Sequence, residues 1–304
     1  MLDNFWASMG SKLAERWLEY IFGPSFLFWV GWFGAYAWKM GWQTILQDIQ
    51  ALTPFEQGVG IVLGLFVLIS SSMLVQAIRF PILRLLEGYW LKPFNYLGLG
   101  MITMRKRSFQ NNTARLRHLA SVDQKTLDIK QLKERTALEI WAHWHPVNAK
   151  DLLPTDLGNI LRAREYSPNR KYGLDVIVCW PRLWPLLPEN ERTDLADARS
   201  TLDRLAELWF WGLLSLLWAG WFHWAVVISI LWLFIAYKMA CQSAMSYGEL
   251  LEAAFDLHRF SLFDALNWPR PRNTKEEQAF GVQLTEYLWR GTLPTPIKYV
   301  GMGK

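Results

Sequence analysis

The sequence predicts an all-α integral membrane protein with four transmembrane helices, two before and two after a helical cytosolic domain. Of its 304 residues, 52% are hydrophobic and 19 are Trp. Residues 208–234 contain no formally charged side chain, and two further apolar runs precede them. Elsewhere apolar residues recur mostly at helical spacing, and no segment offers an obvious partner strand for a sheet.

Residues 1–21 are predicted to form an amphipathic helix. Charged residues occupy one face, and the other face carries Leu2, Trp6, Met9, Leu13, Trp17 and Tyr20. Such a helix either lies in the plane of the lipid headgroups or packs against the cytosolic domain. We do not expect a signal peptide here, because the segment begins with an acidic residue and lacks a basic stretch before a short apolar core.

The first pair of transmembrane helices is expected within residues 22–78. Residues 22–42 form the first apolar run. The second helix has a strong start signal: Thr53 is a suitable cap, Pro54 suits the first helical position, and Glu56 completes a capping box. The connector at 44–52 is amphipathic and is expected to rest at the outer interface, with a re-entrant pore helix as the alternative.

The second of these helices carries the candidate residues for packing and conduction. Gly60 and Gly64 form a GxxxG motif, which lets two helices approach closely. Packing within the chain explains this motif as well as oligomerisation does. The candidates for lining a pore are Ser70, Ser71, Ser72 and Gln76. These serines are equally able to hydrogen-bond to carbonyls of their own helix.

The second pair is predicted within residues 205–238. As one helix, this run would be about 50 Å long, whereas the hydrocarbon core of a bilayer is about 30 Å thick. Two helices fit if the chain reverses at Ala219 and Gly220, where three Trp residues suit a membrane interface. The alternative is a buried hairpin in a large soluble protein.

The distribution of charge predicts the orientation in the membrane. The segment from Arg79 to Arg204 holds 21 of the 32 Lys and Arg residues. The positive-inside rule therefore places the middle domain, 79–204, the tail, 239–304, and both termini in the cytoplasm of a bacterium, below its inner membrane. The two distant cysteines show no disulfide framework, which suits a reducing compartment.

Both cytosolic segments are expected to be helical, with the tail packing on the middle domain. Helices are predicted at 128–146, at 153–168 with Thr155 as its cap, and at the short apolar stretch 175–180. In the tail, two capping boxes are predicted. They are Ser246 with Glu249 and Thr274 with Glu277, and Gly291 suits the end of the second helix.

No constellation of catalytic residues is evident. His143 and His145 are two residues apart, which places them on different faces of a helix, and further metal ligands are missing from the pattern. Asp256, His258 and Arg259 are more simply read as polar links between the tail and the middle domain. Nucleotide-binding, metalloprotease and nucleophile-elbow motifs are absent. We therefore expect no enzyme, cofactor, catalytic residue or metal.

A basic stretch extends from Arg105 to His118. It contains Arg105, Lys106, Arg107, Arg115 and Arg117. Anionic lipid headgroups are its simplest partner near a membrane, whereas a nucleic acid is less expected and a solvated face is the plain alternative. If the protein instead recruits a cytosolic partner, Arg162, Arg164 and Arg182 would join this stretch as the contact face.

Three blocks resemble a loose group of bacterial four-span membrane proteins. They are "LPTDLGNILRAREY", "YGLDVIVCWPRLWPLLP" and "FDLHRFSLFDALNWPRP…LTEYLWRG". The resemblance covers the middle domain and the tail, and it implies a bacterial inner-membrane protein without implying an activity. The two-span, domain, two-span layout also resembles bestrophin-type channels, in topology alone.

These observations favour an oligomeric membrane protein that acts as an ion channel or membrane-permeabilising effector under the control of its cytosolic domain. It would assemble from copies of itself and respond to a cytosolic protein or small-molecule ligand. The alternative is a membrane scaffold that recruits a cytosolic partner. A lipid-acting enzyme that uses His143, His145 or His258 is the third hypothesis.

Overall fold

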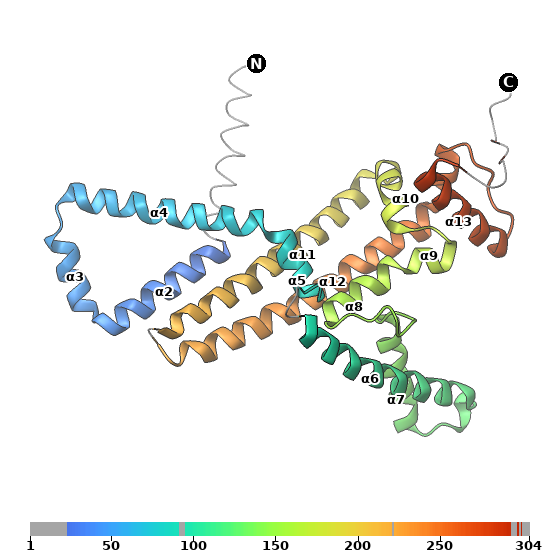
Figure 1. The fold of residues 1–304 in the computed structure, drawn as a ribbon, viewed down its shortest axis with the longest axis horizontal. Helices are drawn as coiled ribbons and strands as arrows, with labels where there is room; N and C mark the ends of the chain where they lie inside the picture. Colours follow the sequence, from blue (N-terminus) through green and yellow to red (C-terminus); the bar gives the residue numbers. More distant parts are fainter. Residues whose placement is uncertain (1–22, 91–94, 221, 293–296, 298, 300–304) are drawn as a thin grey trace, which may run out of the picture. The chain divides into compact units, whose positions relative to one another are not determined.

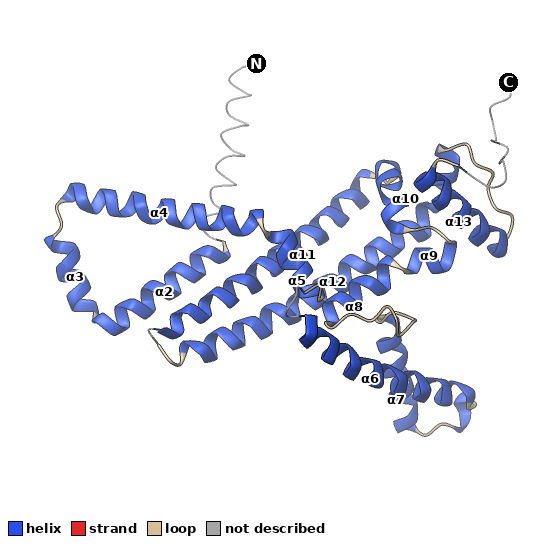
Figure 2. Ribbon diagram, in the orientation of Figure 1, coloured by secondary structure: helices blue, strands red, loops and turns tan. Residues whose placement is uncertain are grey.

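The computed structural model describes residues 23–90, 95–220, 222–292, 297 and 299. Every regular element in these ranges is a helix, and none is a strand (Figure 2). The all-α prediction is therefore confirmed. The amphipathic helix predicted at 1–21 lies outside the described residues.

The chain divides into two compact units. The first combines the chain up to Leu83 with Asp203–Ala240, and the second combines Arg84–Leu202 with the chain from Cys241 onward. The helices α5 (Arg79–Glu87), α11 (Glu189–Leu214) and α12 (Ala225–Ala265) each contribute residues to both units. The domain boundaries expected from the sequence, at 78, 204 and 238, lie close to these divisions.

The first unit begins with α2 (Pro24–Met40), α3 (Trp42–Ala51) and α4 (Pro54–Ala77). Gly41 separates α2 from α3 with a φ of 87°, a left-handed conformation that glycine adopts easily. Figure 1 shows α2 and α4 diverging toward the ends that α3 connects. The capping box at the start of α4 is confirmed, because Thr53 accepts from the Glu56 N–H and the Glu56 carboxylate accepts from the Thr53 N–H.

The apolar run near residue 220 is a helical hairpin. Trp232 Nε1 of α12 donates to the Leu208 carbonyl of α11 over 3.0 Å. Ser215 Oγ donates to Ser229 Oγ over 2.7 Å. Since the earlier residue of one helix pairs with the later residue of the other, the two segments run antiparallel. The short 3-10 helix η3 (Ser215–Gly220) ends at the predicted reversal, and α12 begins at Ala225.

Two helices in the described part of the chain are long and apolar enough to cross a membrane. They are α4, with 24 residues, and α12, with 41. The other two segments expected to cross are shorter, since α2 has 17 residues and α11 gives way to η3 at Ser215. The fold thus contains two candidate spans by length and composition, fewer than the four predicted.

The second unit has its core around the second part of α12. Its elements include α6 (Asn95–Ser121), η1 (Gln124–Thr126), α7 (Ile129–His143), α8 (Asp156–Glu165), α9 (Ser167–Tyr172), α10 (Val176–Leu183), η2 (Trp184–Leu186) and α13 (Thr274–Arg290). The core forms around Phe255, Phe263 and Leu262 of α12, with Leu183 of α10 and Leu284 of α13. The helical prediction for 175–180 is confirmed.

Four further start and end signals can be compared with the structure. Thr155 caps α8 as predicted by accepting from the Gly158 N–H. The capping box at Ser246 is wrong, because α12 continues through it and the Ser246 hydroxyl donates to Gln242 O. The box at Thr274 is also wrong: Asn273 is the cap, and Thr274 is the first helical residue. Gly291 ends α13 as expected, with a φ of 75°.

Candidate functional sites

The polar residues proposed to line a pore point in different directions around α4. Ser71 accepts a hydrogen bond from Trp29 Nε1 of α2 over 3.0 Å and donates to the carbonyl of Leu68. Ser72 is buried, Gln76 is half-buried and Ser70 is exposed. A single chain therefore does not bring these four side chains to one polar surface, and Ser71 serves the contact between α2 and α4.

The GxxxG motif of α4 is uncovered. A Cβ added at Gly60 or at Gly64 would meet no atom within 4 Å. At about 100° per residue, these two glycines and Ser71 lie within about 40° of one another around the helix. The face that packs against α2 at Ser71 thus continues to Gly64 and Gly60, where α2 no longer covers it.

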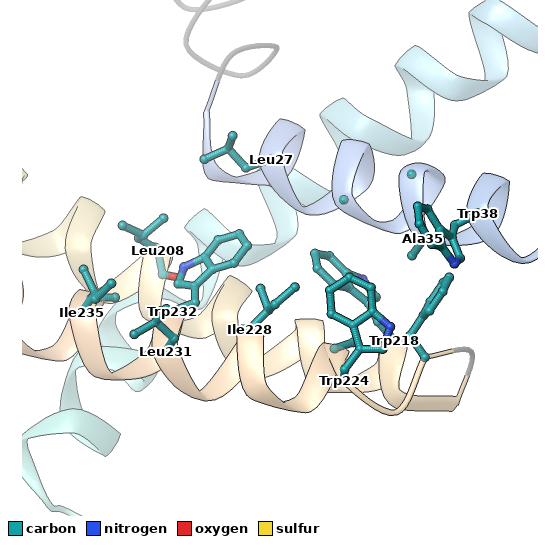
Figure 3. Close-up of a pocket in the computed structure, with 15 residues that line it drawn as sticks. Leu27, Ala35, Trp38, Leu208, Trp218, Trp224, Ile228, Leu231, Trp232 and Ile235 are labelled. Atoms are coloured by element: carbon teal, nitrogen blue, oxygen red, sulfur yellow. The ribbon is translucent and has the colours of Figure 1, made fainter. Parts of the chain in front are cut away.

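An apolar groove of about 650 Å³ lies between α2 and the α11–α12 hairpin. Figure 3 shows Trp38 and Trp224 at one end and Leu208 and Ile235 at the other. The ring of Trp218 packs over Gly31 so closely that a Cβ there would overlap it. Sequence reasoning missed this groove, because its walls come from α2, α11, η3, the turn after η3 and α12, which are separate segments of the chain.

A buried ionic network dominates the second unit. Arg164 of α8 forms an ion pair with Glu252 of α12 and also donates to the His143 carbonyl over 3.0 Å. The second oxygen of Glu252 accepts from Ser167 Oγ over 2.6 Å and lies 2.7 Å from Lys171 Nζ. Glu252 therefore joins α8, α9 and α12 at one carboxylate.

The network continues one turn further along α12. Asp256 accepts from Tyr172 Oη over 2.7 Å and pairs with Lys171 over 3.0 Å. Arg259 pairs with Glu277 of α13 over 2.6 Å and stacks on the Tyr172 ring. The three basic and three acidic members balance, so the arrangement fixes helices together and leaves no excess charge for a ligand.

The surroundings of Glu252 strongly lower the pKa of its carboxyl group. Burial raises the pKa of this carboxyl, but hydrogen bonds from Lys171 and Ser167 and the charge of Arg164 outweigh burial and lower the pKa to about 2. The carboxylate is therefore ionised throughout the physiological range. In contrast, burial raises the pKa of the Cys179 thiol to about 11.

The basic residues expected at a contact face differ in their exposure and in their polar partners. Arg164 is only 3% exposed and serves the interior instead of a surface. Three others have polar partners within the unit: Arg105 with Asp156, Arg115 with Glu134, and Arg162 with Asp151 and Tyr89. Arg182 donates to the Val178 carbonyl. The exposed residues Lys106, Arg107 and Arg117 have no ion pair among the described residues.

The histidines do not form a metal centre in the part of the chain described. His145 contacts the Trp141 carbonyl through Nδ1, and His258 lies 2.8 Å from Glu191. Burial lowers the pKa of His143, and the nearby Arg164 lowers it further. No group of three or more His, Cys, Asp or Glu residues in the described ranges is placed to hold a metal ion.

The second unit also carries a smaller surface groove of about 420 Å³ between α10 and α13. Its walls include Ile177 of α10, which is 78% exposed, and Trp289 of α13, which is 71% exposed. Val282 of α13 also lines the groove. Sequence reasoning missed this groove. The apolar stretch 175–180 was noted in the sequence, but its pattern does not show that Ile177 faces solvent.

Comparison of the chain with protein-family models, with curated proteins and with solved structures finds no match.

Proposed function

We propose that the protein is an oligomeric membrane protein in which copies of α4 assemble around a permeation pathway that the second unit controls. The observation that carries this proposal is the uncovered face of α4 at Gly60 and Gly64. Packing within the chain and oligomerisation explain this GxxxG motif equally well from the sequence, but the described residues supply no helix against it. A second copy supplies one, because small residues let helices approach closely in a bilayer.

The exposure of the first half of α4 supports the same assembly. Every residue from Phe55 to Val67 is exposed in the single chain. In a pore, one side of this segment would face neighbouring copies and another would face lipid. Ser70 is the member of the serine run whose side chain is exposed, so it is the residue that we assign to the pathway.

The proposed orientation in the membrane uses four crossings. The two long helices α4 and α12 cross completely, while α2 and the end of α11 with η3 complete two hairpins. The excess of Lys and Arg in the second unit favours its location in the cytoplasm of a bacterium, with the inner membrane as the host. Labelling of single cysteines placed in α3 and in α13 from either side of sealed vesicles tests this orientation.

The central experiment measures oligomer mass and ion flux on the same preparation. We expect wild-type protein in nanodiscs to be a multimer and to conduct ions in liposomes. A double variant, Gly60→Leu with Gly64→Leu, should lose both properties. Gly58→Leu is the matched control, because Gly58 also faces open space but lies about 160° away from Gly60 around the helix.

A monomeric wild-type protein, or a double variant that keeps its mass and flux, would contradict the proposed assembly. Ser70→Leu refines the test. It should reduce flux without changing the mass, since no hydrogen bond joins Ser70 to α2 among the described residues, whereas a change at Ser71 would also break the bond to Trp29.

A specific observation also favours the scaffold hypothesis as a second candidate. The groove between α10 and α13 exposes Ile177, Val282 and Trp289, and large aromatic side chains are common anchors of protein interfaces. If recruitment is the function, Trp289→Asp should abolish binding of the cytosolic partner without changing the oligomer mass. The Gly60 and Gly64 variant should still bind that partner.

A further inference from the structure

Helix α6 has one face that is firmly packed within the second unit. A Cβ on Gly98 would lie 3.4 Å from the Trp90 ring and 3.5 Å from Pro154. Phe109 is buried, and Arg105 pairs with Asp156 over 2.5 Å. These three residues lie within about 40° of one another around the helix axis. They define the inner face and fix which side of α6 points away from the unit.

The opposite face begins with large apolar side chains. Tyr96 is 78% exposed and Met104 is 74% exposed, and Leu99 is exposed beside them. Tyr96 and Met104 lie about 160° and 240° from Gly98 around the helix. Single exposed apolar residues are common on proteins, but here three of them occur within nine positions of one helix.

Basic side chains follow on the same face. Arg107 lies about 180° from Gly98, between Tyr96 and Met104 around the helix, and Lys106 flanks the face beside Leu99. Both are exposed, and neither has an acidic partner among the residues that the structure describes. An apolar patch next to unpaired positive charge is the pattern of a helix that binds the surface of an anionic bilayer.

The connection to α4 limits how far this face can be from a membrane. The chain between Ala77 and Asn95 contains α5 and eight other residues. Helix rise and the length of extended chain limit its total span to about 45 Å. If α4 crosses the bilayer, as the proposed function requires, the start of α6 stays within reach of the headgroups.

We propose that the start of α6 is a docking site for anionic lipid. Tyr96, Leu99 and Met104 enter the boundary between headgroups and acyl chains, and Lys106 and Arg107 lie against lipid phosphates. The partner is a negatively charged bilayer surface, because a soluble acidic partner would use the two charges but would leave the apolar patch exposed. This inference rests on the proposed membrane location and is independent of pore formation.

The test places a fluorophore at two positions of the outer face in the full chain. Met104→Cys and Ala114→Cys are labelled separately with an environment-sensitive dye, and the protein is reconstituted in nanodiscs of phosphatidylcholine with or without phosphatidylglycerol. Ala114 is exposed on the same face, ten residues further along, so it is the matched control. The native Cys179 and Cys241 are buried, and the unmodified chain gives their labelling background.

We expect a lipid-borne quencher to reach the dye at Met104 in anionic nanodiscs and to reach the dye at Ala114 far less. Each basic residue near an anionic surface contributes about fivefold to binding, so Lys106→Gln with Arg107→Gln should weaken docking about 30-fold. The control with the same loss of charge, Lys125→Gln with Lys133→Gln, should keep the quenching.

Three results would overturn the proposal. They are equal aqueous accessibility of the two dyes in anionic nanodiscs, quenching that does not depend on phosphatidylglycerol, and quenching that survives the loss of Lys106 and Arg107. Oligomer mass is recorded on the same nanodiscs, and ion flux is recorded on liposomes that hold the same protein. A monomeric, non-conducting protein with a lipid-quenched dye at Met104 would refute the pore and leave the docking site standing.

Discussion

Arg164 and Glu252 form an ion pair in the interior of the second unit, although 88 positions separate them in the sequence. The guanidinium also stacks on Trp144 at 4.1 Å from the ring centroid. Gly248 makes room for it, since a Cβ there would lie 2.5 Å from Arg164 Cγ. The pair therefore joins α8 to one side of α12, with the Arg164 side chain 3% exposed and the Glu252 side chain 13% exposed.

Removing one partner of this pair should destabilise the second unit. Glu252→Gln leaves the Arg164 charge buried and uncompensated, and such changes cost about 3 kcal/mol or more. Urea denaturation of the protein in detergent, followed by circular dichroism, measures this cost. Asp264→Asn, which breaks the exposed pair with Arg270, is the control and should leave the midpoint unchanged. Equal midpoints for the two variants would show that the buried pair contributes no stability.

The same carboxylate predicts a dependence on pH. The pKa of Glu252 is about 2 in the folded chain against an ordinary value of 4.5. Because the folded-state pKa is lowered, the contribution is complete above pH 4.5 and is lost as the pH falls toward 2. The loss amounts to about 3 kcal/mol. We expect the difference in unfolding free energy between wild type and Glu252→Gln to shrink across this range, and a constant difference would contradict the assignment.

Gly281 of α13 should not tolerate a side chain. A Cβ there would overlap the backbone carbonyl oxygen of Tyr172 in α9, and backbone cannot move aside cheaply. Gly281→Ala should therefore separate α13 from α9 and cost about 3 kcal/mol. Gly100→Ala in α6 is the matched control, because that glycine faces open space and alanine favours a helix. Thermal unfolding midpoints should fall for the first variant and stay level or rise for the second.

The cysteines should be unreactive in the folded protein. Cys179 is fully buried beside Thr285, and burial raises the pKa of its thiol to about 11, so almost no thiolate exists near neutral pH. Cys241 is buried in α12. Mass spectrometry after brief maleimide treatment should find neither thiol modified in buffer and both modified in denaturant. Rapid labelling of Cys179 in buffer would show that α10 opens from the core.

Local signals explain most of what the sequence predicted correctly. Thr53 and Thr155 cap their helices through bonds to residues three positions away, so the pattern alone identifies them. The hairpin near residue 220 followed from the length of its apolar run. Ser246 failed as a cap because the apolar and polar parts of α12 continue as one helix, and packing overrides a local start signal.

Long-range contacts explain what the sequence did not predict. Arg164 follows the apolar positions of α8 and was expected on the outer face, but its partner Glu252 comes from a distant helix. No spacing rule connects such residues. The groove between α2 and the hairpin and the uncovered face at Gly60 depend on how three helices diverge, which is likewise a property of packing and not of any one segment.

Asn159 holds the turn that precedes α8. Its Oδ1 accepts from the Leu153 N–H over 2.8 Å, and its Nδ2 donates to the carbonyls of Leu153 and Thr155 over 3.0 and 2.8 Å. The side chain is fully buried. Asn159→Ala removes the side-chain partners of the Leu153 N–H and carbonyl, while the Thr155 carbonyl keeps the Asn159 N–H as a donor, and the change should cost about 3 kcal/mol.

Asn159→Asp tests whether the donors matter more than the shape. It keeps the acceptor for Leu153 but turns a carboxylate toward two carbonyl oxygens, so at neutral pH it should destabilise as much as Asn159→Ala. As the pH falls, protonation restores one donor, and this variant alone should regain part of its stability relative to wild type. Urea midpoints at pH 7 and pH 5 give the comparison, with Asn111→Ala on the exposed face of α6 as the control. An Asp variant as stable as wild type at pH 7 would show that the two donated bonds contribute nothing to the turn.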